Sequence, residues 1–206
     1  MAPKSQTHHV ASDVATFGLL AALALVCGYV EAMVPLPIPV PGVKLGLGNV
    51  VVLFTLASFG LRPGFVVMLV KVVACALLFG NPAVFIYSLA GGLVSFVAMA
   101  GALRLRPLSI VGVSMVGGVA HMVGQAGVVA VVLAPYVALT YLPILLVAGL
   151  VAGLLTGYVC RLMIRVFGHS SLFARRRKAM ARAAAPVGEK PLETSLATSQ
   201  RKDSGQ

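Results

Sequence analysis

The chain has 206 residues, of which 59% are hydrophobic and 10% are charged, and its mean hydropathy is +1.00. One soluble core cannot hide this much apolar side chain, and apolar runs of about 20 residues recur along the sequence. A soluble globular protein is therefore excluded. Sixteen basic and five acidic residues give a net charge of +11, and the placement of these charges is more informative than their sum.

The apolar runs predict an all-α integral membrane protein with a bundle of six transmembrane helices. The runs are unbroken rather than alternating, which favours helices over a β-barrel. In chain order we expect helices at Val14–Val34, Leu45–Phe59, Gly64–Phe79, Ala83–Leu103, Ser109–Leu133 and Leu142–Phe167. Proline residues punctuate the connections between them. Three parts follow: an N-terminal segment 1–13, a transmembrane domain 14–167 and a basic tail 168–206.

The basic residues predict the orientation. With a cytoplasmic N-terminus, inside segments carry Lys4, Arg62, Arg104, Arg106 and the tail, whereas Lys44 is the only basic residue in an outside loop. This asymmetry fits the positive-inside rule, so we expect a multi-pass protein of the cell membrane with both termini cytoplasmic.

The tail from His169 onward has eight basic and three acidic residues. A polybasic stretch beside a membrane indicates contact with anionic lipid, and its far end is predicted to be disordered. Nucleic-acid binding is disfavoured because the tail has no aromatic interleaving and no binding motif.

Polar residues at membrane depth predict a binding site in the outer half of the bundle. Such residues are costly in lipid and usually serve a pathway or a site. The predicted substrate-binding residues are Glu31, Lys44, Asn49, Lys71, Tyr87, His121 and Gln125. His121 and Gln125 are four residues apart and so share one helix face. The alternative is that these groups form interhelical hydrogen bonds that hold the bundle together.

The charges narrow the predicted ligand. Glu31 is the only carboxylate in the apolar part of the chain, whereas Lys44 and Lys71 are both cations that could reach it. One ion pair leaves one positive charge over, which an anionic substrate would balance. The competing account is a single structural pair, with Lys44 reaching the interface along its stem.

Several chemistries find no support in the sequence. There is no nucleotide-binding G-x-x-x-x-G-K-[ST] motif, and Asp occurs only at Asp13 and Asp203, so no acidic cluster can hold Mg²⁺ against a diphosphate. Cys27, Cys75 and Cys160 lie singly in apolar runs, without metal-ligand spacing. We therefore expect no enzyme activity, metal or cofactor, and energy for any transport would come from a partner or an ion gradient.

Small residues recur at four-residue spacing in two of the predicted helices. Gly149, Gly153 and Gly157 lie in the last one, and Gly18 and Ala22 in the first. Such spacing lets helices approach closely, either within the chain or against a partner.

The sequence resembles the Gx transporter family, also labelled heptaprenyl diphosphate synthase component I, which is related to the substrate-capture (S) components of energy-coupling factor transporters. The matching blocks are GYVEAMVPLP from Gly28, PGVKLGLGN from Pro41, YSLAGGLVSFVAM from Tyr87, SMVGGVAHMVGQ from Ser114 and YLP from Tyr141. Two positions depart from the family, which more often has Arg in place of Lys71 and Asn in place of Met122. The first change keeps the charge but loses the planar fork of Arg, and the second removes an amide.

The resemblance implies a six-helix S-component bundle that captures a small-molecule substrate, with the loop Pro35–Lys44 as a lid. It also implies a membrane coupling subunit and cytoplasmic ATPases as partners, with Gly18, Ala22 and Ala24 as candidates for the partner face. The alternative function is an accessory membrane component of a heptaprenyl diphosphate synthase system. A third possibility is a membrane scaffold in which the polar residues serve only helix packing.

Overall fold

The computed structural model describes residues 4–33, 46–79, 82–105, 108–132 and 135–168, and every regular element within these ranges is an α-helix. The helices are α1 (Lys4–Met33), α2 (Leu47–Phe59), α3 (Leu61–Phe79), α4 (Pro82–Ala102), α5 (Ile110–Val132) and α6 (Pro135–Gly168). The predicted all-α fold with six helices is confirmed. The predicted lid Pro35–Lys44 and the tail beyond Gly168 lie outside the described residues.

Four helices begin earlier than predicted: α3 at Leu61 rather than Gly64, α4 at Pro82 rather than Ala83, and α1 and α6 by a wider margin. α1 starts at Lys4 rather than Val14, and no Gly or Pro interrupts the stretch between them. α6 starts at Pro135 rather than Leu142 and carries Pro143 inside it. Proline suits the first helical position, where its fixed φ fits and its missing N–H would have no partner in the helix. Pro135 therefore opens α6 instead of only ending the connection before it, and Pro82 opens α4 in the same way.

α2 and α3 are joined by a single residue, Gly60. Its φ of 94° is a conformation that residues with a side chain rarely adopt. The Gly60 amide donates to the carbonyl of Leu56 at 3.1 Å, and its own carbonyl accepts from the Gly64 amide at 3.2 Å. This glycine therefore ends one helix and starts the next, so the chain can reverse direction with almost no loop.

Five of the helices are long and apolar enough to cross a membrane; α2 is a shorter apolar helix. With 13 residues, α2 is about 20 Å long, which is less than the hydrocarbon thickness of about 30 Å. Nine of its residues are buried, among them Leu53 and Thr55, which are fully enclosed. The chain is a multi-pass membrane protein whose shortest helix is surrounded by the others.

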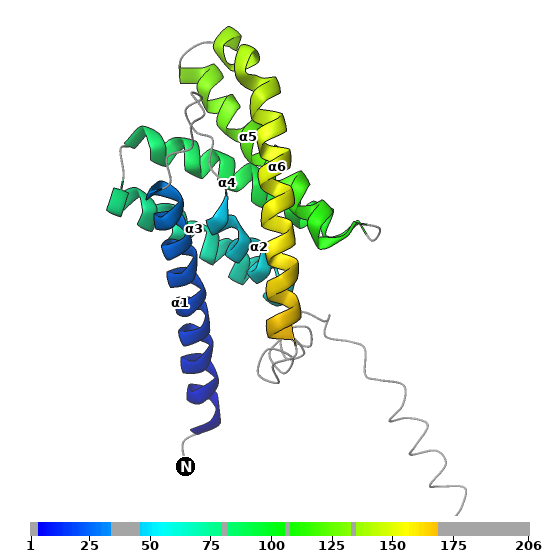
Figure 1. Cartoon of the computed structure of the whole chain (residues 1–206). Helices are drawn as coiled ribbons and strands as arrows, with labels where there is room; N and C mark the ends of the chain where they lie inside the picture. Colours follow the sequence, from blue (N-terminus) through cyan, green and yellow to red (C-terminus); the bar gives the residue numbers. More distant parts are fainter. Residues whose placement is uncertain (1–3, 34–45, 80–81, 106–107, 133–134, 169–206) are drawn as a thin grey trace, which may run out of the picture.

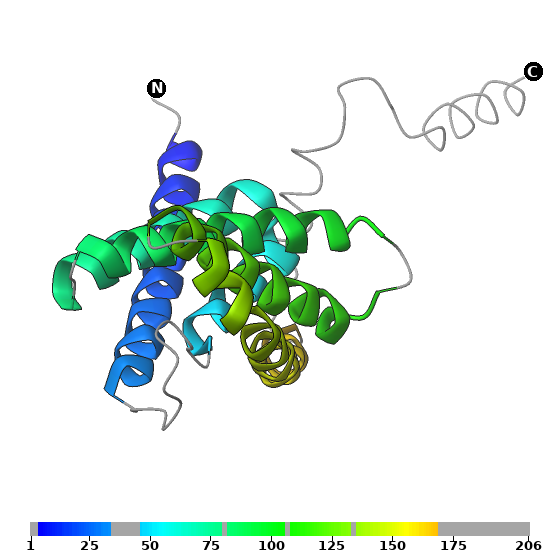
Figure 2. The ribbon, with the colours of Figure 1, turned by 90° about the horizontal axis from the view of Figure 1, so that it is seen from above.

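The packing order explains why α2 is so deeply enclosed. It contacts α1, α3 and α6, while α5 packs between α4 and α6, and α3 contacts α4. Figure 1 shows α2 between α1 and α6, and Figure 2 shows that the helices cross one another at varied angles instead of standing as parallel rods. The first three helices and the last three thus form two groups that meet around α2.

The glycines of α6 pack against α5 within the molecule. A Cβ on Gly149 would lie 2.7 Å from the carbonyl oxygen of Gly118, and one on Gly153 would lie 2.7 Å from the carbonyl oxygen of Ser114. Gly157 meets the backbone of Val111 in the same way. We call this contact, made by Gly118, Gly149, Gly153 and Gly157, the α5–α6 seam. Its glycines let two backbones touch, as small residues do in membrane helix pairs.

Of the three α1 residues predicted for the partner face, Ala24 lies inside the molecule. Gly18 and Ala22 are exposed on α1, and a Cβ on Gly18 would meet nothing within 4 Å. Ala24, by contrast, is 0% exposed and belongs to the core. Its carbonyl oxygen would lie 3.2 Å from a Cβ on Gly48, so this side of α1 faces α2. The prediction for Ala24 is wrong because the small side chain admits α2 and not an outside partner.

Candidate functional site

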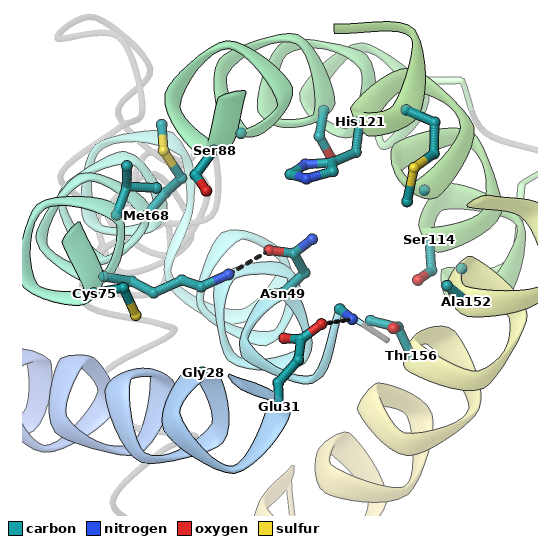
Figure 3. Close-up of a pocket in the computed structure, with 18 of the residues that line it drawn as sticks. Gly28, Glu31, Asn49, Met68, Cys75, Ser88, Ser114, His121, Ala152 and Thr156 are labelled. Carbon is teal, nitrogen blue, oxygen red and sulfur yellow. Dashed lines mark hydrogen bonds between the residues drawn. The ribbon is translucent and has the colours of Figure 1, made fainter. Parts of the chain in front are cut away.

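A cavity of about 170 Å³ lies where the two groups of helices meet. All six helices contribute to its wall, together with Gly46 just before α2. The polar side chains in the wall include Glu31, Asn49, Lys71, Ser88, His121 and Thr156. Figure 3 shows Ser88 and His121 facing Asn49 and Glu31 across this space. Four of the seven predicted site residues, Glu31, Asn49, Lys71 and His121, therefore share one cavity.

The first turn of α2 links the two charged residues of the wall. Gly46 has a φ of 75°, and its amide donates to Oε1 of Glu31 on α1. The carbonyl of Gly46 accepts from the backbone amide of Asn49 at 2.8 Å. The side-chain oxygen Oδ1 of Asn49 accepts from Nζ of Lys71, also at 2.8 Å. A continuous set of hydrogen bonds thus runs from the carboxylate through this turn to the ammonium. Glu31 is only 9% exposed, so its charge is held well inside the protein.

The position of Lys71 depends on a glycine of the neighbouring helix. A Cβ on Gly48 would lie 2.6 Å from Cε and 2.9 Å from Nζ of Lys71. The half-buried lysine therefore crosses α2 where that helix has no side chain, and its ammonium reaches Asn49.

His121 has a comparable setting on the other side of the cavity. A Cβ on Gly91 of α4 would lie 2.9 Å from Cε1 and 3.0 Å from Nε2 of the imidazole. Nε2 of Gln125 lies 3.2 Å from Nε2 of His121, which places the amide directly against the ring. Gln125 is 3% exposed, and its Oε1 has no hydrogen-bond partner among the described residues. Gln125 thus contacts the ring of a cavity residue from outside the cavity.

Two predicted site residues that the structure describes, Tyr87 and Gln125, are not among the residues that line the cavity. Gln125 contacts the ring of His121, and Tyr87 is half-buried, while its neighbour Ser88 lines the cavity. Lys44 lies outside the described residues. The sequence does not give the rotation of a helix about its own axis. Consecutive residues point about 100° apart, so the sequence could not predict whether Tyr87 or Ser88 faces the cavity.

Sequence reasoning missed Thr156 of α6 as a site residue. It is 5% exposed and lines the cavity beside Gly46; its Oγ1 would lie 3.4 Å from a Cβ on that glycine. The available signal was a lone threonine in the otherwise apolar and glycine-rich run from Ile144 to Gly157. Ser114 of α5 also lines the cavity. Both residue types are common in helix packing, which masks such a signal.

The wall suits recognition of a polar solute. Its described residues offer one ammonium, one carboxylate, an amide, hydroxyls and an imidazole, and among these charged groups Lys71 and Glu31 balance. Ser95 also lines it, but its hydroxyl donates to the carbonyl of Gly117 at 2.8 Å and so holds α4 to α5. Within the described ranges no group of three or more His, Cys, Asp or Glu is placed to hold a metal ion.

Comparison with known proteins yields one family. The family model described as heptaprenyl diphosphate synthase component I matches residues 20–163, which is more than half of the chain and includes every cavity residue named above. No curated protein and no solved structure matches the chain. The resemblance inferred from the sequence is confirmed under this label, while the relation to S components stays a prediction.

Proposed function

This chain belongs to the heptaprenyl diphosphate synthase component I family, and from that premise we propose that it is the substrate-binding membrane subunit of an uptake transporter for a small polar solute. The single observation that carries the proposal is the cavity to which all six helices contribute polar or small residues. In a scaffold, polar groups would serve only to bond to one another between helices. Here Glu31 and Lys71 do bond to neighbouring elements, but they and His121, which come from three different helices, also border one cavity.

The cost of placing charged side chains in a membrane favours a binding site over a role in helix packing alone. A hydrogen bond between membrane helices contributes about 0.6 kcal/mol on average. Placing a charged side chain at the membrane centre costs about 2.5 to 3.5 kcal/mol on insertion scales. A charged side chain at that depth therefore costs more than one such hydrogen bond returns. A bound solute that interacts with Lys71 and Glu31 supplies a reason for their presence.

The coupling and the orientation belong to the proposal as well. We place both termini in the cytoplasm of a cell-membrane protein, because the predicted inside loops carry Arg62 and Arg104. The sequence has no nucleotide-binding motif of its own, so the energy would come from a membrane coupling subunit and cytoplasmic ATPases, as in energy-coupling factor systems. The cavity would then act as the S component's capture site.

The family description favours a second candidate, an accessory membrane component of a heptaprenyl diphosphate synthase system. Cavity size counts against a prenyl chain as the occupant. A cavity of about 150 Å³ holds a benzene-sized ligand, so about 170 Å³ suits six to eight non-hydrogen atoms. A heptaprenyl chain has 35 carbons by its chemical definition, several times that number. An accessory role would thus have to use another surface.

A thermal-shift screen of the detergent-purified protein tests the proposal. The panel contains amino acids, vitamins, nucleobases and prenyl phosphates, since a ligand at 100-fold over its Kd stabilises by about 2.7 kcal/mol. We expect one class of small solute to raise the Tm, and we expect this shift to vanish in Lys71→Met and His121→Ala.

Thr140→Ala is the control for this screen. Thr140 is exposed on α6, and its hydroxyl donates to the carbonyl of Tyr136 in its own helix, so its ligand shift should match the wild type. Equal shifts in all variants would reject the site. A panel without hits, combined with faster chain elongation by a prenyl diphosphate synthase when this protein is added, would favour the accessory role.

A further inference from the structure

The charged residues of the cavity wall are one carboxylate and one ammonium. Among the described lining residues, Glu31 and Lys71 are the only Asp, Glu, Lys or Arg side chains. They are linked through the first turn of α2: Glu31 accepts from the Gly46 amide, and Lys71 donates to Asn49 three residues later. A negative and a positive group therefore border the same cavity, and Figure 3 shows the two hydrogen bonds as dashed lines.

Each charge is held in place yet borders the cavity. Lys71 donates to Asn49, and Glu31 accepts from the Gly46 amide. The side-chain amide nitrogen of Asn49 adds a neutral donor. Preorganised, opposite charges in one wall suit a ligand that itself carries two opposite charges.

Net charge selects among the ligand classes. A charge buried without a counter-charge is strongly unfavourable in a low-dielectric interior. With Glu31 and Lys71 both ionised, a monoanion would leave the described site with one negative charge, and a monocation would leave one positive charge. A zwitterion leaves the site neutral and also brings one charge of opposite sign to each charged residue of the wall.

The rest of the wall sets the size and the polarity of the ligand. Met68, Val72 and Phe85 form an apolar portion of the lining. About 170 Å³ suits six to eight non-hydrogen atoms, by comparison with a benzene-sized ligand in about 150 Å³. Alanine has six non-hydrogen atoms and valine has eight by their chemical formulae, so this range suits a small α-amino acid with a short apolar side chain.

We propose that the cavity binds a small zwitterion, an α-amino acid from alanine to valine in size, with its carboxylate at Lys71 and Asn49 and its ammonium at Glu31. This inference rests on the proposed function and names its substrate class.

Isothermal titration of the detergent-purified full chain with matched probes tests the inference. The probes are l-alanine, l-2-aminobutyrate and l-valine, then 3-methylbutanoate, which is valine without the ammonium, and 2-methylpropylamine, which is valine without the carboxylate. Uracil serves as a neutral probe of similar size and l-phenylalanine as an oversized one. We expect at least one of the three small amino acids to bind and the two single-charge probes to bind about 30-fold more weakly or worse.

Two variants should reverse the charge preference; Glu31→Gln keeps the hydrogen-bond framework, whereas Lys71→Met loses the hydrogen bond to Asn49. Glu31→Gln keeps an oxygen for the Gly46 amide but removes the negative charge, so it should weaken amino-acid binding and favour 3-methylbutanoate over it. Lys71→Met should favour 2-methylpropylamine. Thr140→Ala should behave as wild type, and thermal unfolding without ligand identifies any variant that fails to fold. Glu31→Gln is the milder of the two and decides the matter if Lys71→Met is unfolded.

The possible outcomes distinguish a failure of the amino-acid proposal from a failure of the proposed function. Tightest binding of 3-methylbutanoate, 2-methylpropylamine or uracil by the wild type would overturn the zwitterion, and tightest binding of l-phenylalanine would overturn the size limit; each result would still leave a solute-binding cavity. Binding of none of these probes, with a hit elsewhere in the wider solute panel, would also overturn it. Binding of no solute in either experiment would overturn the proposed function as well. An unchanged amino-acid preference in Glu31→Gln would remove Glu31 as the ammonium's partner.

Discussion

The glycines of the α5–α6 seam and the glycines beside Lys71 and His121 serve opposite purposes. At the seam, Gly149 brings a backbone so close to Gly118 that a Cβ would lie 2.7 Å from a carbonyl oxygen. Next to the cavity, Gly48 and Gly91 leave room for the side chains of Lys71 and His121, which line it. The neighbour at the seam is rigid backbone, whereas the neighbour of Gly48 and Gly91 is the end of a polar side chain. The same residue type therefore lets two backbones touch in one region and seats polar side chains in the other.

The comparison predicts the largest stability loss at the seam. Gly149→Ala would place its Cβ against the backbone of α5 and against Cγ of Met122 at 2.8 Å. Neither helix can move without losing the rest of the contact, so we expect a loss of about 2 to 3 kcal/mol in the free energy of unfolding. Thermal unfolding in detergent measures it. Gly127→Ala on α5 is the matched control, because nothing lies within 4 Å of its Cβ, and its Tm should be unchanged or higher.

An unchanged Tm in Gly149→Ala would mean that the two helices are free to separate. The distinction between a rigid seam and a cavity with adaptable side chains would then be lost.

A substitution at Gly48 should cause a smaller loss of stability, and the size of this loss should depend on the side chain of Lys71. Gly48→Ala would displace the end of Lys71, a long side chain, so we expect about 1 to 2 kcal/mol of destabilisation together with weaker ligand binding. In a Lys71→Ala background, the same substitution should cost at least about 0.5 kcal/mol less, because its main obstacle is gone. Ligand binding should not return in the double variant, since the ammonium is absent. Unfolding and titration of the four proteins of this cycle provide both measurements.

A cost of Gly48→Ala that is independent of residue 71 would contradict the proposed seating of the lysine. It would instead place the obstacle at the carbonyl oxygen of Ala24, 3.2 Å from the added Cβ. Gly48 would then belong with the seam glycines.

The sequence was sufficient for much of the fold and for part of the site. Apolar runs and prolines predicted six helices, and Glu31, Asn49, Lys71 and His121 stood out because polar side chains are rare at membrane depth. The rotation of each helix was not readable, which is why Gln125 was expected in the wall but lies behind His121. The seating role of Gly48 was hidden for another reason. A glycine in a membrane helix has the same appearance in a sequence whether it meets a backbone or a lysine, so only three-dimensional contacts tell the two apart.

Two threonines of α6 allow the same kind of comparison for hydroxyl groups. Here we expect the smallest effect, a change in the Kd of the solute. Thr156 lines the cavity, whereas Thr140 is exposed and bonds to its own helix. A neutral hydrogen bond contributes about 1 kcal/mol, so Thr156→Ala should weaken binding of the solute identified in the screen by about fivefold. Thr140→Ala should leave the Kd unchanged. Because the two substitutions are chemically identical and lie on one helix, helix propensity cancels between them. Equal Kd values in the two variants would imply that the solute does not bond to the α6 hydroxyl and would confine its polar contacts to the walls formed by α1 to α5.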